Sequence, residues 1–143
     1  MRLRRTLAPL AALTLAGLVS LAAPAEARAT TFTVTMTGAE ELPPGDPDGV
    51  GTARFTIDPA TDRICFVLLA SGVDLPIHAA HIHLGGAGEI GSPVVNLPPM
   101  PTGRAAGCVT DPDADAIVAN PAGYYVNVHN SPYPFGALRA QLA

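Results

Sequence analysis

Residues 31–37 read Thr-Phe-Thr-Val-Thr-Met-Thr, so apolar side chains occupy every second position. Side chains of a strand point alternately to its two faces, and this pattern therefore predicts a strand with one buried face. Residues 52–57 repeat the alternation, with Ala53, Phe55 and Ile57 predicted to point inward. Residues 63–70 are more uniformly apolar, which predicts a central strand.

The rest of the chain consists of further short apolar stretches between turn-rich segments. Strands are expected at residues 78–83, 93–97, 108–110, 124–129 and 135–142. One short helix is predicted near residues 111–120, with Asp111 as N-cap and Pro112 as first helical residue. Seven or eight short strands with little helix predict an all-β protein, an antiparallel Greek-key sandwich or barrel.

Three of the four histidines lie in the stretch His-Ala-Ala-His-Ile-His at residues 78–83. Ala80 and Ile82 are apolar and are assigned to the core, so His81 and His83 are predicted to point outward, about 7 Å apart along the strand. His78 precedes His81 by three positions and is therefore predicted to face inward. There its imidazole would bond to backbone groups and fix a loop, which is a structural role.

The same alternation places the fourth histidine on the outer face. In residues 124–129 the inward set contains the two valines, so Asn127 and His129 point outward. In the last strand two leucines point inward, which leaves Arg139 outward. If these strands are neighbours, His81, His83, His129 and Arg139 form one patch.

Histidines at positions i and i+2 of a strand, joined by one from another strand, are a suitable set of metal ligands. Imidazole is a good ligand for copper and zinc, and three nitrogens leave a coordination position open. The alternative is that outward histidines are ordinary surface residues without a ligand. The sequence leaves both interpretations open for His81, His83 and His129.

The first 29 residues have the composition of a secretory signal peptide. Arginines at positions 2, 4 and 5 precede an Ala/Leu-rich run, and small-residue cleavage patterns follow at Ala27 and Ala29. We therefore expect a mature single domain over residues 30–143 that is secreted, either extracellular or periplasmic, and not held in a membrane after cleavage.

The mature domain is acidic. It contains four arginines, no lysine and eleven acidic residues, a formal charge of −7. A surface of this sign repels nucleic acid and anionic lipid, so neither is expected as a partner. It is compatible with cation binding.

Cys65 and Cys108 are the only cysteines of the chain. In an oxidising compartment an even pair indicates a disulfide. A thiolate metal site is the alternative.

Several stretches resemble the CHRD domain, a family found alone in many secreted bacterial proteins. The resemblance is carried, in order along the mature chain, by residues 36–44, 51–53, 79–83, 91–95, 125–129 and 138–142. It implies a fold more than an activity, because the biochemical role of the family is poorly defined.

A second, more distant similarity is to copper/zinc superoxide dismutase, an eight-stranded Greek-key barrel. The stretch His78-Ala79-Ala80-His81-Ile82-His83 resembles a motif of that enzyme whose last two histidines bind copper and whose first is structural. His129 resembles a later copper ligand, and Arg139 resembles the arginine that guides the anionic substrate. Residues 84–110 contain no histidine, so no zinc site is expected.

Three functions follow as hypotheses. The first is a secreted protein that binds a metal, with copper favoured, through His81, His83 and His129. The second is a redox enzyme of the dismutase type at the same site, with Arg139 guiding an anion. The third is a non-catalytic module that binds an extracellular protein or polysaccharide, with contacts from Tyr125, Tyr133 and Phe135. Oligomeric state is left open.

Overall fold

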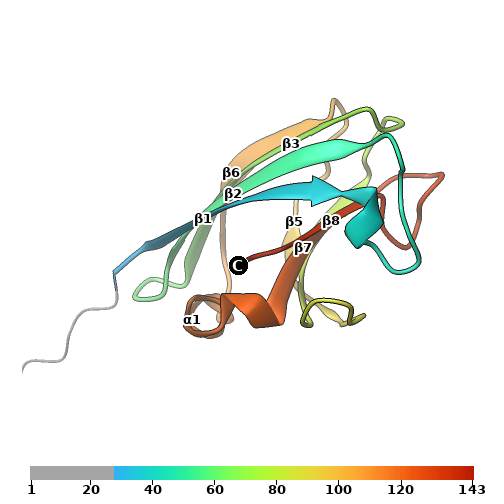
Figure 1. Ribbon diagram of the computed structural model, residues 1–143. Helices are drawn as coiled ribbons and strands as arrows, with labels where there is room; N and C mark the ends of the chain where they lie inside the picture. The colour runs from blue at the N-terminus through green and yellow to red at the C-terminus, as the bar shows by residue number, and fades with distance from the viewer. Residues whose placement is uncertain (1–27) are drawn as a thin grey trace, which may run out of the picture.

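A computed structural model describes residues 28–143 as strands linked by loops, with one short α-helix (Figure 1). The strands are β1 (Thr30–Thr37), β2 (Val50–Asp58), β3 (Arg63–Ser71), β4 (Ala79–Leu84), β5 (Pro93–Leu97), β6 (Arg104–Thr110), β7 (Tyr124–His129) and β8 (Leu138–Gln141). The helix α1 spans Ala114–Ala119, and two single 3₁₀ turns cover Gly38–Glu40 and Pro121–Gly123.

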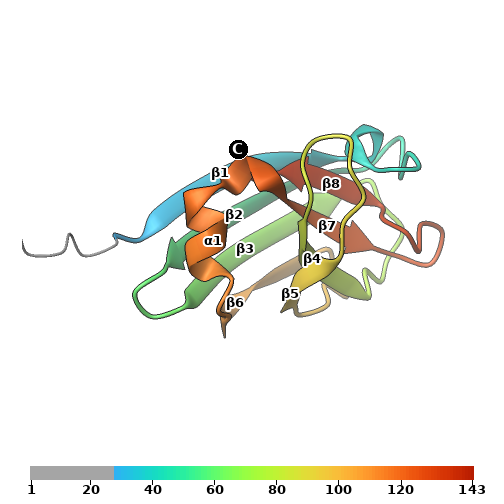
Figure 2. The ribbon, with the colours of Figure 1, turned by 90° about the horizontal axis from the view of Figure 1, so that it is seen from below.

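All eight strands form one antiparallel sheet in the order β5-β4-β7-β8-β1-β2-β3-β6. The sheet curls into a nearly closed barrel (Figures 1 and 2). Strands β3 and β6 are neighbours, as are β4 and β7, although neither pair is consecutive in the chain. Such non-sequential pairing is the mark of a Greek key, and the all-β prediction is confirmed.

The interior is filled by the residues that the alternation assigned to it. Ala53, Phe55 and Ile57 of β2 are fully buried, and so are Val126 and Leu138 from the far side of the barrel. Strand β3 is paired on both sides, with β2 and β6, as expected of a strand that is not at an edge. Its outward Val67 and Leu69 are nevertheless exposed, so burial in the core does not account for all of the apolar residues of this strand.

The helix is shorter than predicted. It begins at Ala114, with Asp113 at the N-cap position, and Asp111 Oδ1 accepts a hydrogen bond from the backbone N–H of Asp113 in the turn that precedes it. Asp111 is therefore a turn residue, and its prediction as N-cap is wrong. Ala114 and Ile117 are buried and belong to the core.

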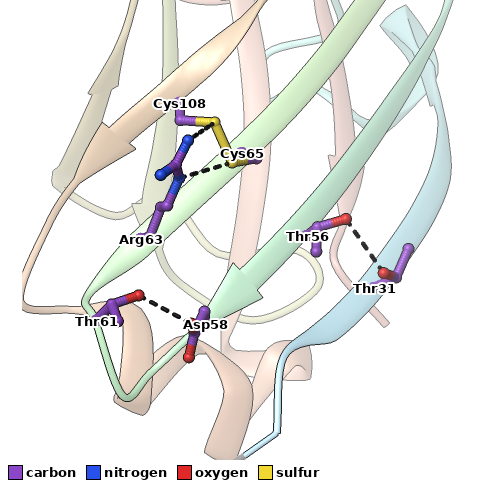
Figure 3. The surroundings of a disulfide bond; sticks show 7 residues. All are labelled: Thr31, Thr56, Asp58, Thr61, Arg63, Cys65 and Cys108. Atoms are coloured by element: carbon purple, nitrogen blue, oxygen red, sulfur yellow. Dashed lines mark hydrogen bonds between the residues drawn. A yellow bond between two sulfur atoms is a disulfide. The ribbon is translucent and has the colours of Figure 1, made fainter.

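The two cysteines form a disulfide between neighbouring strands (Figure 3). Cys65 of β3 lies directly opposite Cys108 of β6, the strand at one end of the sheet order. Arg63 donates to both sulfurs, at 3.3 Å from Cys65 Sγ and 3.4 Å from Cys108 Sγ. The disulfide prediction is confirmed, and the thiolate metal site is excluded for this oxidised pair.

Replacing both cysteines by serine is expected to lower the free energy of unfolding by about 4 kcal/mol, because the crosslink closes a long loop in the unfolded chain. The loop spans a sequence separation of 43 residues. Urea denaturation of the double variant measures the loss, and reduced wild-type protein should match it. A loss below about 1 kcal/mol would mean that the unfolded chain is already compact around this pair.

No helix among residues 28–143 is long and apolar enough to cross a membrane. The signal peptide predicted for residues 1–29 lies outside the described residues, apart from its last two positions.

Candidate metal centre

The candidate site lies on the outer face of three adjacent strands, β4, β7 and β8. The register places His81 opposite Asn127, and Asn127 opposite Arg139. His83 lies opposite Tyr125 by the same pairing of β4 with β7. Strands far apart in sequence therefore bring these outward side chains into one cluster, as the alternation predicted.

The three outward histidines converge. One ring nitrogen each of His81, His83 and His129 lies within 4.8 Å of the others. The closest approach is 3.1 Å, between His81 Nδ1 and His129 Nε2. Nitrogens that share an ion at about 2.0 Å lie about 3 to 3.5 Å apart, so small side-chain rotations bring the set to ligand spacing.

Backbone carbonyls fix which nitrogen of two rings carries the proton. His129 Nδ1 donates to the Pro134 carbonyl at 3.1 Å, and His83 Nδ1 donates to the Gly91 carbonyl at 2.8 Å. A neutral imidazole has one N–H, so Nε2 of each ring carries the lone pair. This is the arrangement found in metal-binding histidines, whose second nitrogen is held by a carbonyl or carboxylate.

The lone pair of His83 is unpaired among residues 28–143. Its Nε2 is fully buried and makes no hydrogen bond with the described residues. Leaving a buried polar atom unpaired costs about 1 to 3 kcal/mol. The donor set therefore fits a metal ion, which would satisfy this atom together with nitrogens of His81 and His129.

The site faces away from the core, yet it is not open to solvent as an outward position suggested. His83 is 8% exposed and His129 is 9% exposed, while His81 is half-buried. The loop between β4 and β5, residues 85–92, folds back over this face, and Figure 2 shows it in yellow beside β7 and β8. The expectation of a surface patch is corrected to a covered site that is most open at His81.

Arg139 holds this loop in place. Its Nη1 donates to the Glu89 carbonyl at 2.7 Å, and its Nη2 donates to the Gly86 carbonyl at 2.9 Å. The side chain is 2% exposed and lies over the Tyr125 ring, with its guanidinium carbon 3.4 Å from the ring centroid. A guanidinium in this position does not meet solvent anions, so the structure gives no support to the predicted role in anion guidance.

His78 does not occupy the predicted inward position. Its side chain is exposed, and its backbone N–H donates to the His129 carbonyl at 3.0 Å. Strand β4 begins only at Ala79, and the buried core position before it is taken by Ile77. The alternation is therefore interrupted between residues 77 and 80, which turns His78 outward and rules out its inward, loop-fixing role.

Burial keeps the three imidazoles neutral. Loss of solvation, followed by the charge of His81, lowers the pKa of His129 to about 4. Loss of solvation also lowers the pKa of His81 and of His83 below the usual value. Neutral rings keep the lone pairs that a metal needs, and the carbonyl bonds at Nδ1 orient two of them.

Three residues of the site were missed from the sequence as site residues. Asn127 is central, because its side-chain amide lies 3.0 Å from His129 Nε2. Tyr125 stacks on His83, with ring centroids 4.8 Å apart.

The sequence offered different signals for these residues. Alternation placed Asn127 on the correct face, whereas Glu41 lies in an irregular loop with no periodic signal. Tyr125 is 3% exposed, so it cannot serve as the partner contact predicted for it.

Glu41 is an acid buried in the same network. Loss of solvation raises its pKa to about 7, against the opposing effect of the Arg139 charge. Its Oε1 is buried without a hydrogen bond to the described residues. The carboxyl group is packed against Gly136, where any added Cβ would overlap it.

Because the pKa of Glu41 is raised on folding, its contribution to stability falls as pH rises from about 4.5 to 7. We expect Glu41→Gln to match the wild type near pH 4.5 and to be more stable at pH 8, by on the order of 3 kcal/mol. Urea denaturation across this pH range measures the difference. Glu40→Gln provides the control, because the side chain of this neighbouring glutamate is exposed. Equal stability of Glu41→Gln and wild type at pH 8 would contradict the expectation.

The comparison with protein families now decides the classification. The CHRD domain family matches the chain over residues 32–142. The chain belongs to the CHRD domain family. The match covers all three candidate ligands of this CHRD domain and the residues that surround them.

No curated protein and no solved structure matches this CHRD domain. The similarity to copper/zinc superoxide dismutase therefore rests on the residues quoted for it.

Proposed function

We propose that this CHRD domain is an exported protein that holds one copper ion through His81, His83 and His129. The observation that carries the proposal is the buried Nε2 of His83, which has a lone pair, no hydrogen bond, and two further imidazole nitrogens within 4.8 Å. A metal ion supplies the missing partner for this atom.

The chemistry of the donors favours copper. The cluster consists of three imidazoles without a carboxylate, which excludes the oxygen-liganded cations calcium and magnesium. Structural zinc sites are usually closed by four protein ligands, whereas this cluster supplies three. Nitrogen sites bind copper most tightly among the divalent first-row metals, which further supports copper.

The location rests on two observations. The disulfide between Cys65 and Cys108 is typical of an oxidising compartment. The first 29 residues have the composition of an export signal. Both support a protein that meets its metal outside the cytoplasm.

We infer that the role is binding rather than catalysis. A redox enzyme needs an open path for its substrate, whereas His83 and His129 are buried and Arg139 is engaged with carbonyls of the β4–β5 loop. Copper-loaded protein is accordingly expected to remove superoxide no faster than free copper. A rate well above that of free copper, and one that falls in Arg139→Lys, would instead support the dismutase hypothesis.

The hypothesis of a protein- or polysaccharide-binding module keeps the exposed Phe135 and the half-buried Tyr133 as contacts.

Two titrations of the metal-free mature protein test the site, one with Cu(I) under anaerobic conditions and one with Cu(II). Isothermal calorimetry should give one ion per chain, with a dissociation constant below about 1 μM. His81→Ala combined with His83→Ala should weaken binding at least about 100-fold, which corresponds to about 2.7 kcal/mol. His78→Ala is the matched control and should bind as the wild type does, because its ring is exposed outside the cluster. Binding of both Cu(I) and Cu(II) weaker than about 10 μM, or equal binding by the double variant, would reject the proposal.

A further inference from the structure

The charges around the histidines limit which ion the site prefers. The guanidinium carbon of Arg139 lies 3.4 Å from the Tyr125 ring centroid, and that ring is stacked on His83 at 4.8 Å and 15°. A fixed positive charge therefore lies within about 8 Å of the His83 ring. Arg139 is buried, so solvent and salt screen this charge only weakly.

The ligands themselves supply no compensating negative charge. The three candidate ligands are imidazoles, which bind metals as neutral rings, with no carboxylate or thiolate in the set. Glu41 interacts electrostatically with Arg139, and it offsets the guanidinium only in part because burial raises its pKa to about 7. An ion of charge +2 is thus repelled about twice as strongly by Arg139 as an ion of charge +1.

Building on the metal site proposed above, we propose that this centre is selective for the monovalent cuprous ion over divalent copper and zinc, and that Arg139 is the residue that sets this selectivity. The number of donors points the same way. Cu(II) favours square-planar or tetragonal coordination, which needs at least four donors. The cluster supplies only three nitrogens. Arg139 acts through the field at the site and through the loop it holds, so it is a positioning residue.

Competition titrations of the mature protein measure the selectivity directly. Cu(I), Cu(II) and Zn(II) are each titrated under anaerobic conditions against a chelator of known affinity. We expect Cu(I) to bind at least 100-fold more tightly than either divalent ion. For copper this ratio corresponds to a reduction potential about 118 mV above that of the free couple, at 59 mV for each tenfold. A divalent ion that binds as tightly as Cu(I) would overturn the selectivity.

Two substitutions separate the charge of Arg139 from its structural role. Coulomb's law at about 8 Å and an effective dielectric constant of about 20 gives roughly a 30-fold effect for one unit of charge. Arg139→Met should therefore lower the ratio of Cu(I) to Zn(II) affinity by roughly 30-fold, and Arg139→Lys, which keeps the charge, should restore most of it. Circular dichroism at low temperature establishes that each variant is folded before it is titrated.

Glu41→Gln provides a second measurement that does not depend on the fold of an Arg139 variant. Removing the carboxylate leaves the guanidinium without its acidic neighbour, so at pH 8 the ratio should rise severalfold, while Glu40→Gln leaves it unchanged. A ratio that falls or stays constant in Glu41→Gln would overturn the role of this charge. Failure to bind any of the three ions would instead reject the metal site itself, and the two failures are thus distinguished.

Discussion

Arg139→Met is expected to lower the free energy of unfolding by about 4 kcal/mol, because two hydrogen bonds from a charged group are lost, each worth about 1.5 to 3 kcal/mol. Methionine fills part of the volume but donates no hydrogen bond. The Glu89 carbonyl loses its donor from Arg139, the Gly86 carbonyl keeps only the backbone N–H of Glu89, and Tyr125 loses the guanidinium that covers its ring. Glu41 would also lose the positive charge that opposes the rise of its pKa.

Urea denaturation at pH 7 measures this loss, with Arg54→Met as the matched control. Arg54 lies on β2 with an exposed side chain, so its replacement is expected to change stability by no more than about 0.5 kcal/mol. Hydrogen exchange should locate the effect of Arg139→Met first in residues 85–92. Similar losses in the two variants would show that the loop contacts of Arg139 add nothing to stability.

Gly91→Ala is expected to be the most damaging single methyl group added to the chain, with a loss on the order of 3 kcal/mol. An alanine Cβ at this position would lie 1.5 Å from the Leu84 carbonyl oxygen, and this neighbour is backbone that cannot rotate away. The loop would have to move, although the Gly91 carbonyl accepts the hydrogen bond from His83 Nδ1. Copper affinity should therefore fall together with stability.

Gly86→Ala is the control within the same loop. There the nearest atom to an added Cβ is the flexible carboxylate of Glu89, at 3.4 Å. An alanine that fits the native backbone reduces the freedom of the unfolded chain, so this variant should be neutral or slightly stabilised. Thermal denaturation and copper titration of the pair measure both effects, and a Gly91→Ala protein with unchanged affinity would mean that His83 does not depend on the loop.

The barrel and the positions of its candidate metal ligands could be predicted because a strand has a period of two. Alternation alone placed Phe55 in the core and put His81, His83 and His129 on one face. The pairing of Cys65 with Cys108 followed from their number and the expected compartment. The assignments to a face use only local sequence and the alternation of side chains along a strand. This alternation does not depend on which strands pair with each other.

The cover of the site could not be predicted, because it depends on a loop without periodicity. Nothing in residues 85–92 indicates that their carbonyls bond to Arg139, and an outward arginine is normally solvated. The prediction for His78 was wrong for a related reason, because it extended the alternation of β4 beyond the start of the strand at Ala79. Glu41 is separated from Arg139 by almost the whole mature chain and meets it only after the sheet has formed.

The pairing of β4 with β7 joins ligands that are 48 residues apart in the chain. An unfolded chain keeps His81 and His83 close but separates both from His129, so under the proposed function it is expected to bind the ion more weakly than the folded barrel does. Under the proposed function, metal binding and folding are linked, and the melting temperature is expected to rise with the concentration of free copper. An ion that binds as proposed and is present at 100 times its dissociation constant would add about 2.7 kcal/mol to the native state, so scarcity of the metal would lower the stability of the fold.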